Sequence, residues 1–269
     1  MFSADPPQSH PFSHLALLKC MGLFHLTLAV LAAAAPAAAF LHVPRSQCSN
    51  LLEKPMVEIS EELGDKTVNT GETLDLTCKV VSTPSAAIIW LHNGKEIESH
   101  GTPEAEAMTV GQRIGVGEIE ARLVRRCVTE ADAGEYTCMA VTPCSEPVLS
   151  TSTVSVNKAN RPGKCMPLLA APHISLFTAS RMELPVNPVQ LMCRTPARGA
   201  KTVWERLDED GRGRLVKGLN GFMQLDNGDL IVDGSAQGEE DLASMTLRCT
   251  VHSMTGLAEA VTSILFLDP

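Results

Sequence analysis

Short stretches of alternating apolar and polar residues recur along this chain. In residues 72–80, Leu74, Leu76, Cys78 and Val80 fall on one face of an extended segment, with polar residues on the other. Strict alternation of this kind is typical of a half-buried β-strand. Further alternating or apolar runs lie at 88–91, 148–156, 189–193, 230–232, 245–251 and 261–267. The pattern predicts an all-β chain of many short strands, an arrangement typical of β-sandwiches.

One apolar run near the start has a different character. Residues 23–35 form a stretch of about 13 residues, which is too short to span a bilayer and has the length of a signal-peptide core. Lys19 supplies a positive charge before it, and Ala37-Ala38-Ala39 fits a small-residue cleavage site after it. The run predicts a cleaved signal peptide over residues 1–39, with a buried core helix as the alternative.

The mature chain is then expected to begin near Phe40 and to be secreted into the extracellular space, where disulfides persist. Met1 and Met21 both remain candidate starts of translation. No second apolar run is long enough to span a membrane, so we expect a product without a membrane anchor.

Composition narrows the functional classes. The chain has 269 residues and a net charge of −9, and this acidic balance argues against nucleic-acid binding, which needs clustered Lys and Arg. Its nine cysteines are too many for an ordinary cytosolic enzyme. Loss of Cys20 with the signal peptide leaves eight, the even number that a disulfide framework needs. A zinc site is the alternative use, although the chain has no Cys-x-x-Cys spacing.

No catalytic motif is recognisable in the sequence. The chain has no His-Glu-x-x-His segment, and no spacing suggests a Ser-His-Asp or Cys-His arrangement. We therefore expect no enzymatic activity, no cofactor and no metal.

The rare aromatic residues stand at informative positions. Trp90 follows Cys78 by 12 residues, and the chain's single tyrosine lies in a segment of the form Asp-x-Gly-x-Tyr-x-Cys. The four defined positions of that segment are Asp132, Gly134, Tyr136 and Cys138. This order is the signature of an immunoglobulin domain, in which two cysteines bridge facing sheets, the Trp packs on the bridge and the Tyr hydroxyl closes a corner. We predict a Cys78–Cys138 disulfide in a first sandwich.

The signature partly repeats in the second half of the chain. Trp204 follows Cys193 by 11 residues, and Cys249 closes the set. The positions that correspond to the Asp, Gly and Tyr of the corner hold Ala243, Met245 and Leu247. We predict a Cys193–Cys249 disulfide in a second sandwich, with a less rigid end where the tyrosine corner is missing.

These motifs divide the chain into segments. Prolines and a glycine interrupt any strand in the region between the two copies, which indicates a linker. The expected segments are a signal peptide (1–39), an N-terminal segment (40–54), a first immunoglobulin-like domain (55–157), a linker (158–172) and a second immunoglobulin-like domain (173–269).

Longer segments carry a closer resemblance. Residues 71–78 and 90–97 look like the first domain of small secreted proteins with two immunoglobulin domains, and 178–185, 225–231 and 265–269 look like their second domain. The chain thus resembles the nematode zwei-Ig proteins and the arthropod ImpL2-like proteins. The resemblance implies two tandem I-set-like sandwiches in an extracellular protein. In arthropod relatives it implies binding of insulin-like peptides and antagonism of insulin signalling, and in nematode relatives maintenance of neuronal position.

Four cysteines lie outside the two core bridges, and they allow three pairings. They are Cys48, Cys127, Cys144 and Cys165. The resemblance implies a Cys127–Cys165 disulfide, which would tether the linker to the first sandwich. Cys48–Cys144 is the pair that remains.

Two functions compete at this point. The first is a binding protein that sequesters an insulin-like peptide, which needs no chemistry and follows from the resemblance. The second is a cell-surface or matrix interaction protein, as in the nematode relatives. An exposed strand edge or sheet face is available to a partner in either case, but the sequence does not indicate which residues bind it.

Overall fold

A computed structural model describes residues 55–101, 115–159, 165–166, 170–236 and 244–267. The expected signal peptide (1–39) and N-terminal segment (40–54) lie outside these residues. Within them, the chain forms β-strands and two short 3₁₀ helices, η2 (Glu130–Asp132) and η4 (Gly234–Ala236). None of the helices in this part of the chain has the length and apolar character to cross a bilayer.

In the residues described, the first sandwich has eight strands. They are β1 (Met56–Glu61), β2 (Lys66–Asn69), β3 (Leu74–Thr83), β4 (Ala87–His92), β5 (Lys95–His100), β6 (Gly117–Arg125), β7 (Gly134–Val141) and β8 (Val148–Asn157). Strands β1, β3 and β6 form one layer, and β2, β8, β7, β4 and β5 form the five-stranded sheet that faces it. The core between them is aliphatic around Trp90 and the cysteine bridge.

The alternation of apolar and polar residues in the sequence corresponds to the inward and outward faces of the strands. Along β3, residues alternate strictly between buried and half-buried, so Leu74, Leu76, Cys78 and Val80 point into the core. Cys78 and Cys138 form a disulfide with an S–S distance of 2.02 Å between the two layers. A tight turn at Asn93-Gly94, both with positive φ, joins β4 to β5, as that dipeptide predicts.

The tyrosine corner is present in the first sandwich. The Tyr136 hydroxyl donates a hydrogen bond to the backbone carbonyl of Asp132 at 2.9 Å. Burial raises the pKa of Tyr136, and the Asp132 carboxylate adds to the shift, so the hydroxyl stays a donor. Gly134 has a φ of 138° and lies against Asn93, where a Cβ would approach the Asn93 amide oxygen to 2.3 Å. A side chain at this position is therefore excluded by both conformation and space.

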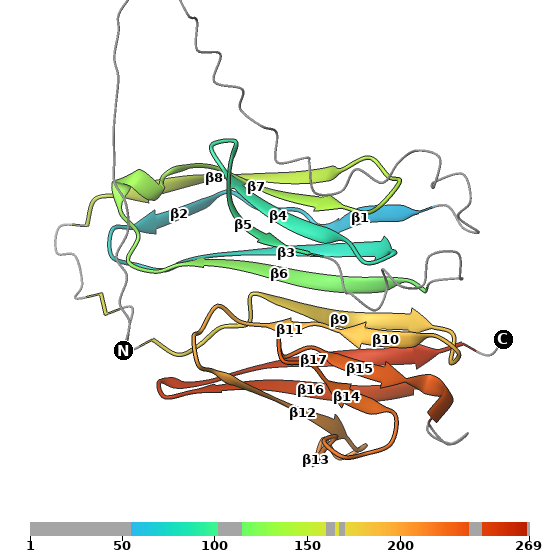
Figure 1. Cartoon of the computed structure of the whole chain (residues 1–269). Coiled ribbons are helices and arrows are strands. Elements are labelled where there is room, and N and C mark those ends of the chain that lie inside the picture. The colour runs from blue at the N-terminus through green and yellow to red at the C-terminus, as the bar shows by residue number, and fades with distance from the viewer. Residues whose placement is uncertain (1–54, 102–114, 160–164, 167–169, 237–243, 268–269) are drawn as a thin grey trace, which may run out of the picture. The chain divides into compact units, whose positions relative to one another are not determined.

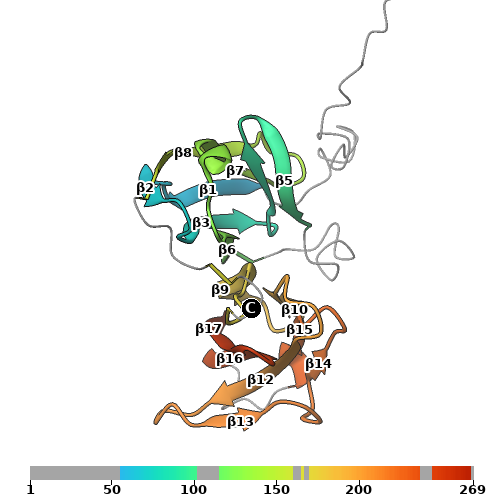
Figure 2. The same cartoon turned by 90° about the vertical axis from the view of Figure 1, so that its left-hand side faces the viewer.

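The second sandwich follows the same plan, with several very short strands beside two long ones. They are β9 (Leu176–Glu183), β10 (Pro188–Leu191), β11 (Cys193–Arg194), β12 (Lys201–Leu207), β13 (Gly213–Leu215), β14 (Phe222–Gln224), β15 (Leu230–Asp233), β16 (Ser244–Ser253) and β17 (Gly256–Phe266). Figure 2 shows β10, β15 and β14 as a layer beside β17, β16 and β12. The prediction of an all-β chain with two tandem sandwiches is confirmed.

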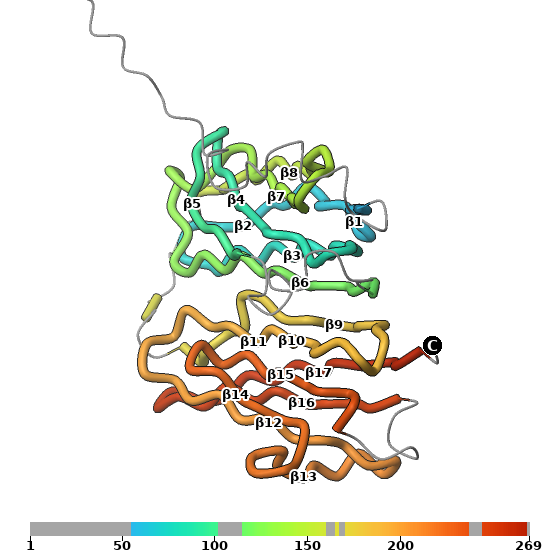
Figure 3. Tube along the Cα trace, turned by 45° about the vertical axis from the view of Figure 1, so that its right-hand side comes forward, coloured from blue at the N-terminus to red at the C-terminus, as the bar shows by residue number. Residues whose placement is uncertain are grey.

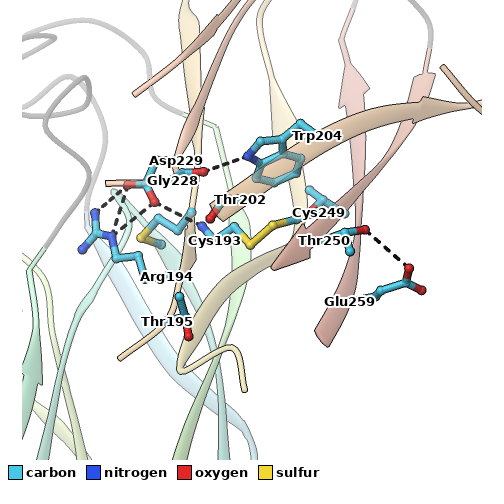
Figure 4. Close-up of a disulfide and its surroundings, with 12 residues drawn as sticks. Cys193, Arg194, Thr195, Thr202, Trp204, Gly228, Asp229, Cys249, Thr250 and Glu259 are labelled. Carbon is cyan, nitrogen blue, oxygen red and sulfur yellow. Dashed lines mark hydrogen bonds and ion pairs between the residues drawn. A yellow bond between two sulfur atoms is a disulfide. The ribbon is translucent and has the colours of Figure 1, made fainter. Parts of the chain in front are cut away.

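A buried polar cluster stabilises the core of the second sandwich. Cys193 and Cys249 form its disulfide, and Trp204 Nε1 donates to the Gly228 carbonyl at 2.8 Å (Figure 4). The neighbouring Asp229 is fully buried, and its carboxylate accepts hydrogen bonds from Arg194 at 2.8 Å and from the Cys193 backbone at 3.1 Å. Gln190 and Asn227 donate to the same carboxylate. Asp229 therefore fastens β11 to the β14–β15 hairpin through a satisfied buried charge.

Leu247 stands where the second sandwich lacks its tyrosine. It is fully buried in the apolar core, so this position contributes packing and no corner hydrogen bond. Ala243 lies outside the described residues. The lower rigidity expected at this end stays a prediction.

The two sandwiches share one sheet. Strand β6 pairs with β9 in antiparallel register, and β9 continues in parallel register to β17 (Figures 1 and 3). The result is a nine-stranded sheet in the order β1-β3-β6-β9-β17-β16-β12-β13, with β11 attached to β9. The sequence predicted two sandwiches joined by a linker, and it did not predict this pairing.

The tyrosine corner yields a prediction about stability. Replacing Tyr136 by Phe removes one buried hydrogen bond and leaves the Asp132 carbonyl without it, so we expect a loss of about 1 kcal/mol in the free energy of unfolding. Urea unfolding monitored by fluorescence measures it. Thr153→Ala, an exposed change on the neighbouring strand, should alter stability by less than about 0.5 kcal/mol. An unchanged Tyr136→Phe protein would contradict the role assigned to the corner.

Candidate interaction surface

The nine-stranded sheet has a face that points away from both cores. One row of residues in continuous register crosses seven of its strands. The row consists of Glu58, Val81, Glu118, Ser180, Ser263, Thr246 and Leu207. On β3, β6 and β17 the neighbours of these residues along the strand are buried, so the row lies on the outward side of the sheet, which we call the open face. It crosses from the first sandwich to the second without a break.

The second-sandwich half of the open face carries exposed apolar side chains. Met182 on β9 and Leu265 on β17 are paired in register and are 43% and 41% exposed. Val261, further along β17, is 48% exposed. Beside Val261, Arg248 forms an ion pair with Glu205 at 2.7 Å. Apolar side chains next to satisfied polar groups are typical of surfaces that bind other proteins.

The first-sandwich half of the open face is rich in carboxylates. Glu118 accepts a hydrogen bond from Ser60, and Glu61 pairs with Lys79 at 2.7 Å. Burial raises the pKa of Glu120, with Glu118 and Glu61 adding to the shift while Lys79 and Arg122 oppose it. The two halves of the open face thus differ in character, with acidic residues on one and apolar residues on the other.

A buried ion pair lies on the opposite side of the sheet, where the two sandwiches meet. Arg181 and Glu183 on β9 are each 3% exposed and are joined at 2.8 Å. Glu183 also accepts hydrogen bonds from the backbone of Gly115 and from Asn187, and Arg181 donates to Ser85. Because Ser85 and Gly115 belong to the first sandwich, the pair fixes β9 against both.

Close backbone contacts also join β9 to the first sandwich, and we call this junction of the two sandwiches the seam. The Met182 amide donates to the Val116 carbonyl at 2.8 Å, and the Arg122 amide donates to the Ser175 carbonyl at 2.8 Å. A Cβ at Gly115 would lie 1.7 Å from the Met182 carbonyl oxygen, so only glycine allows this approach. Leu176 of β9 packs into the core of the first sandwich. The seam therefore has the packing of a domain interior.

Three of the remaining four cysteines lie in the described residues, with Cys144 in the loop between β7 and β8. Cys127, which follows β6, forms a disulfide with Cys165 in the segment between the sandwiches. Cys144 is also disulfide-bonded. Cys48 lies outside the described residues, and its pairing with Cys144 stays a prediction.

The aromatic signature residues identified from the sequence lie in the cores of the two sandwiches, beneath the sheets. Trp90, Tyr136 and Trp204 are at most 1% exposed, and Asp132 and Gly134 shape the turn before β7. None of them reaches the open face. Sequence reasoning missed Arg181 and Glu183, although a charged residue at an inward position of a strand was the available signal.

Comparisons with known proteins place this geometry in a family. An immunoglobulin-domain family model matches residues 54–141. The zwei Ig domain protein zig-3 of Caenorhabditis elegans is 31% identical over 188 residues, which cover 68% of this chain and 72% of that protein. The chain belongs to the zwei Ig domain proteins. Zig-4 of the same organism is 29% identical over 225 residues, covering 82% of this chain and 83% of that protein.

A solved structure shares the fold of this zwei Ig protein. The crystal structure of neural ectodermal development factor IMP-L2 superposes with a TM-score of 0.57 at 18% identity, covering 79% of this chain and 95% of that one. At this identity the likeness concerns the fold. The resemblance to the zwei Ig and ImpL2-like proteins expected from the sequence is thus confirmed, by sequence for the first group and by fold for the second.

The buried ion pair at the seam leads to a prediction about stability, in which a buried pair should matter and an exposed pair should not. Glu183→Ala leaves Arg181 buried without its carboxylate, so we expect a loss of about 3–5 kcal/mol in unfolding free energy. The double variant Arg181→Met/Glu183→Met should be more stable than Glu183→Ala because no unpaired charge remains. Urea denaturation measures all three proteins.

A matched control exists in the exposed pair Arg212–Asp210, whose side chains are 77% and 69% exposed. Arg212→Ala should leave stability unchanged within error. Equal losses for Glu183→Ala and Arg212→Ala would show that the buried pair does not hold the seam.

Proposed function

We propose that this protein is a secreted extracellular binding protein that sequesters insulin-like peptides and thereby antagonises insulin signalling. The observation that carries the proposal is the open face, which joins both sandwiches in one continuous surface. The sequence resemblance to ImpL2-like proteins supplies the class of ligand. No catalytic step is required.

The size of the open face suits a small folded peptide. Seven strands at about 4.8 Å spacing span roughly 29 Å. A folded peptide of about 50 residues has a radius of gyration of about 10 Å. One side of such a peptide therefore fits within the row that runs from Glu58 to Leu207.

The chemistry of the open face suggests how the ligand is held. Met182, Val261 and Leu265 offer apolar contact near the centre, where fully desolvated side chains dominate the binding energy. The carboxylates around Glu118 favour basic groups on the ligand and raise the association rate. The ligand is then withheld from its receptor by mass action.

A second function has its own support. Two relatives matched over most of the chain, and over most of their own length, are nematode zwei Ig proteins. Their resemblance favours an extracellular interaction with a cell-surface or adhesion protein that serves neuronal development or maintenance. In that case the protein binds cell surfaces in the absence of hormone.

Titration calorimetry with insulin-like peptides tests the first proposal. We expect binding in the micromolar range or tighter, and Leu265→Glu on the open face should weaken it at least about tenfold, which corresponds to about 1.4 kcal/mol. Leu149→Glu changes another exposed leucine, on the five-stranded sheet, and is the matched control, which should bind like the wild type.

The outcomes separate the two functions. Absence of binding to every insulin-like peptide tested, together with staining of cells by the tagged protein, would replace the first function by the second. Equal weakening by Leu265→Glu and Leu149→Glu would remove the open face as the binding surface.

A further inference from the structure

The chain that leads into β9 continues the antiparallel register of the seam. The Arg122 amide donates to the Ser175 carbonyl at 2.8 Å, and the Arg126 guanidinium donates to the Ala171 carbonyl. These two contacts are four residues apart on each segment, and His173 stands midway between them. His173 is therefore flanked on both sides by arginines of the first sandwich.

The backbone around His173 is held by both sandwiches. Ile174 is buried in the core of the second sandwich, and Leu176 is buried in the core of the first. The His173 carbonyl accepts a hydrogen bond from the Thr195 hydroxyl at 2.7 Å. Because the chain is fixed on both sides, a change of charge on the half-buried His173 acts on the seam itself.

The positive charges around His173 are those of arginines. Arg122 and Arg126 face it from the first sandwich. Arg194 of β11 directs its guanidinium to the buried Asp229 at 2.8 Å. The two arginines of the first sandwich are thus the cations that a protonated His173 meets.

The carboxylates that face His173 are Asp75 on β3 and Glu98 on β5. Asp75 already forms an ion pair with Arg122, and a Glu98 oxygen lies 3.0 Å from His100 Nε2. Each carboxylate therefore already has a basic partner. Protonation of His173 adds a third positive charge beside the two arginines, at a place where burial makes that charge costly.

We propose that His173 is an acid-sensitive switch in the seam: protonation of its imidazole loosens residues 171–175 from the end of β6 and opens the seam at the end where the chain enters β9. The Arg181–Glu183 ion pair lies at the other end of β9 and holds that end closed. The seam then opens from one end only. The change is reversible, because it requires a proton and no covalent step.

The electrostatics give the direction of the effect. Burial lowers the pKa of His173 below its ordinary value of 6.5, and Arg126 and Arg122 add to the shift while Glu98 and Asp75 oppose it. The detached segment takes up the proton more readily than the closed seam, so acid favours the open form. The contribution of His173 to the closed seam is therefore complete at neutral pH and is lost as the pH falls through about 6.5.

Loosening of the seam has a consequence for ligand binding, and this consequence alone rests on the proposed function. The seam joins the two halves of the open face, so a ligand that contacts both halves binds less tightly when the seam opens. A complex taken up from outside the cell into an acidic compartment then releases its ligand. The switch itself needs no ligand, so it is tested on the protein alone and independently of peptide binding.

Hydrogen exchange of the intact protein, followed by mass spectrometry at about pH 7.5 and about pH 5.5, tests the proposal. Labelling times are scaled to the intrinsic exchange rate at each pH. We expect the amides of residues 119–126 and 171–178 to exchange about threefold faster or more at the lower pH, and those of residues 180–183 to stay unchanged. His173→Gln, which is uncharged at both pH values, should abolish the acceleration.

Two further variants complete the test. His252→Gln changes an exposed histidine on β16 and should respond to acid like the wild type. Arg126→Gln removes one of the two cations and should reduce the acceleration, and it decides the matter if His173→Gln is unfolded at neutral pH. Absence of acceleration in the wild type, or equal acceleration in the wild type and a folded His173→Gln protein, would overturn the proposal. Loss of the acceleration in His252→Gln but not in His173→Gln would assign the response to another histidine and overturn it equally.

Discussion

The pairing of β6 with β9 is the constraint on which the rest of the structure depends. It uses ordinary backbone hydrogen bonds, but it joins two sheets that would each otherwise end in an unpaired edge. A tandem of two immunoglobulin domains linked only through its connecting segment is expected to move at the joint. Here the joint is a strand pair backed by the Arg181–Glu183 ion pair, and the domains present one surface as a consequence.

The sequence was sufficient for the two cores. Cys78, Trp90 and Tyr136 each have a role that spacing reveals, because a disulfide, a packed indole and a corner hydroxyl all act within one sandwich. The seam was not predictable in the same way. Pairing between β6 and β9 depends on backbone groups that every residue carries, and the bulge at Glu118 and Ile119 that sets its register leaves no distinctive composition.

The second sandwich shows how a missing motif is compensated. It has no tyrosine corner, and a fully buried Asp229 with four donor residues fastens β11 to the β14–β15 hairpin instead. An aspartate in an Asn-Gly-Asp turn reads as a surface residue in a sequence, because such turns are usually solvated. Its burial follows from the position of Arg194, and that contact arises only in the folded chain.

The Cys127–Cys165 disulfide has a consequence for how the molecule withstands proteases. It closes a covalent ring that contains β7, β8 and the segment leading to the second sandwich. A single cut anywhere in that ring leaves both ends attached through the disulfide. The two sandwiches thus stay one molecule after such a nick, and the surface they share keeps both halves in place.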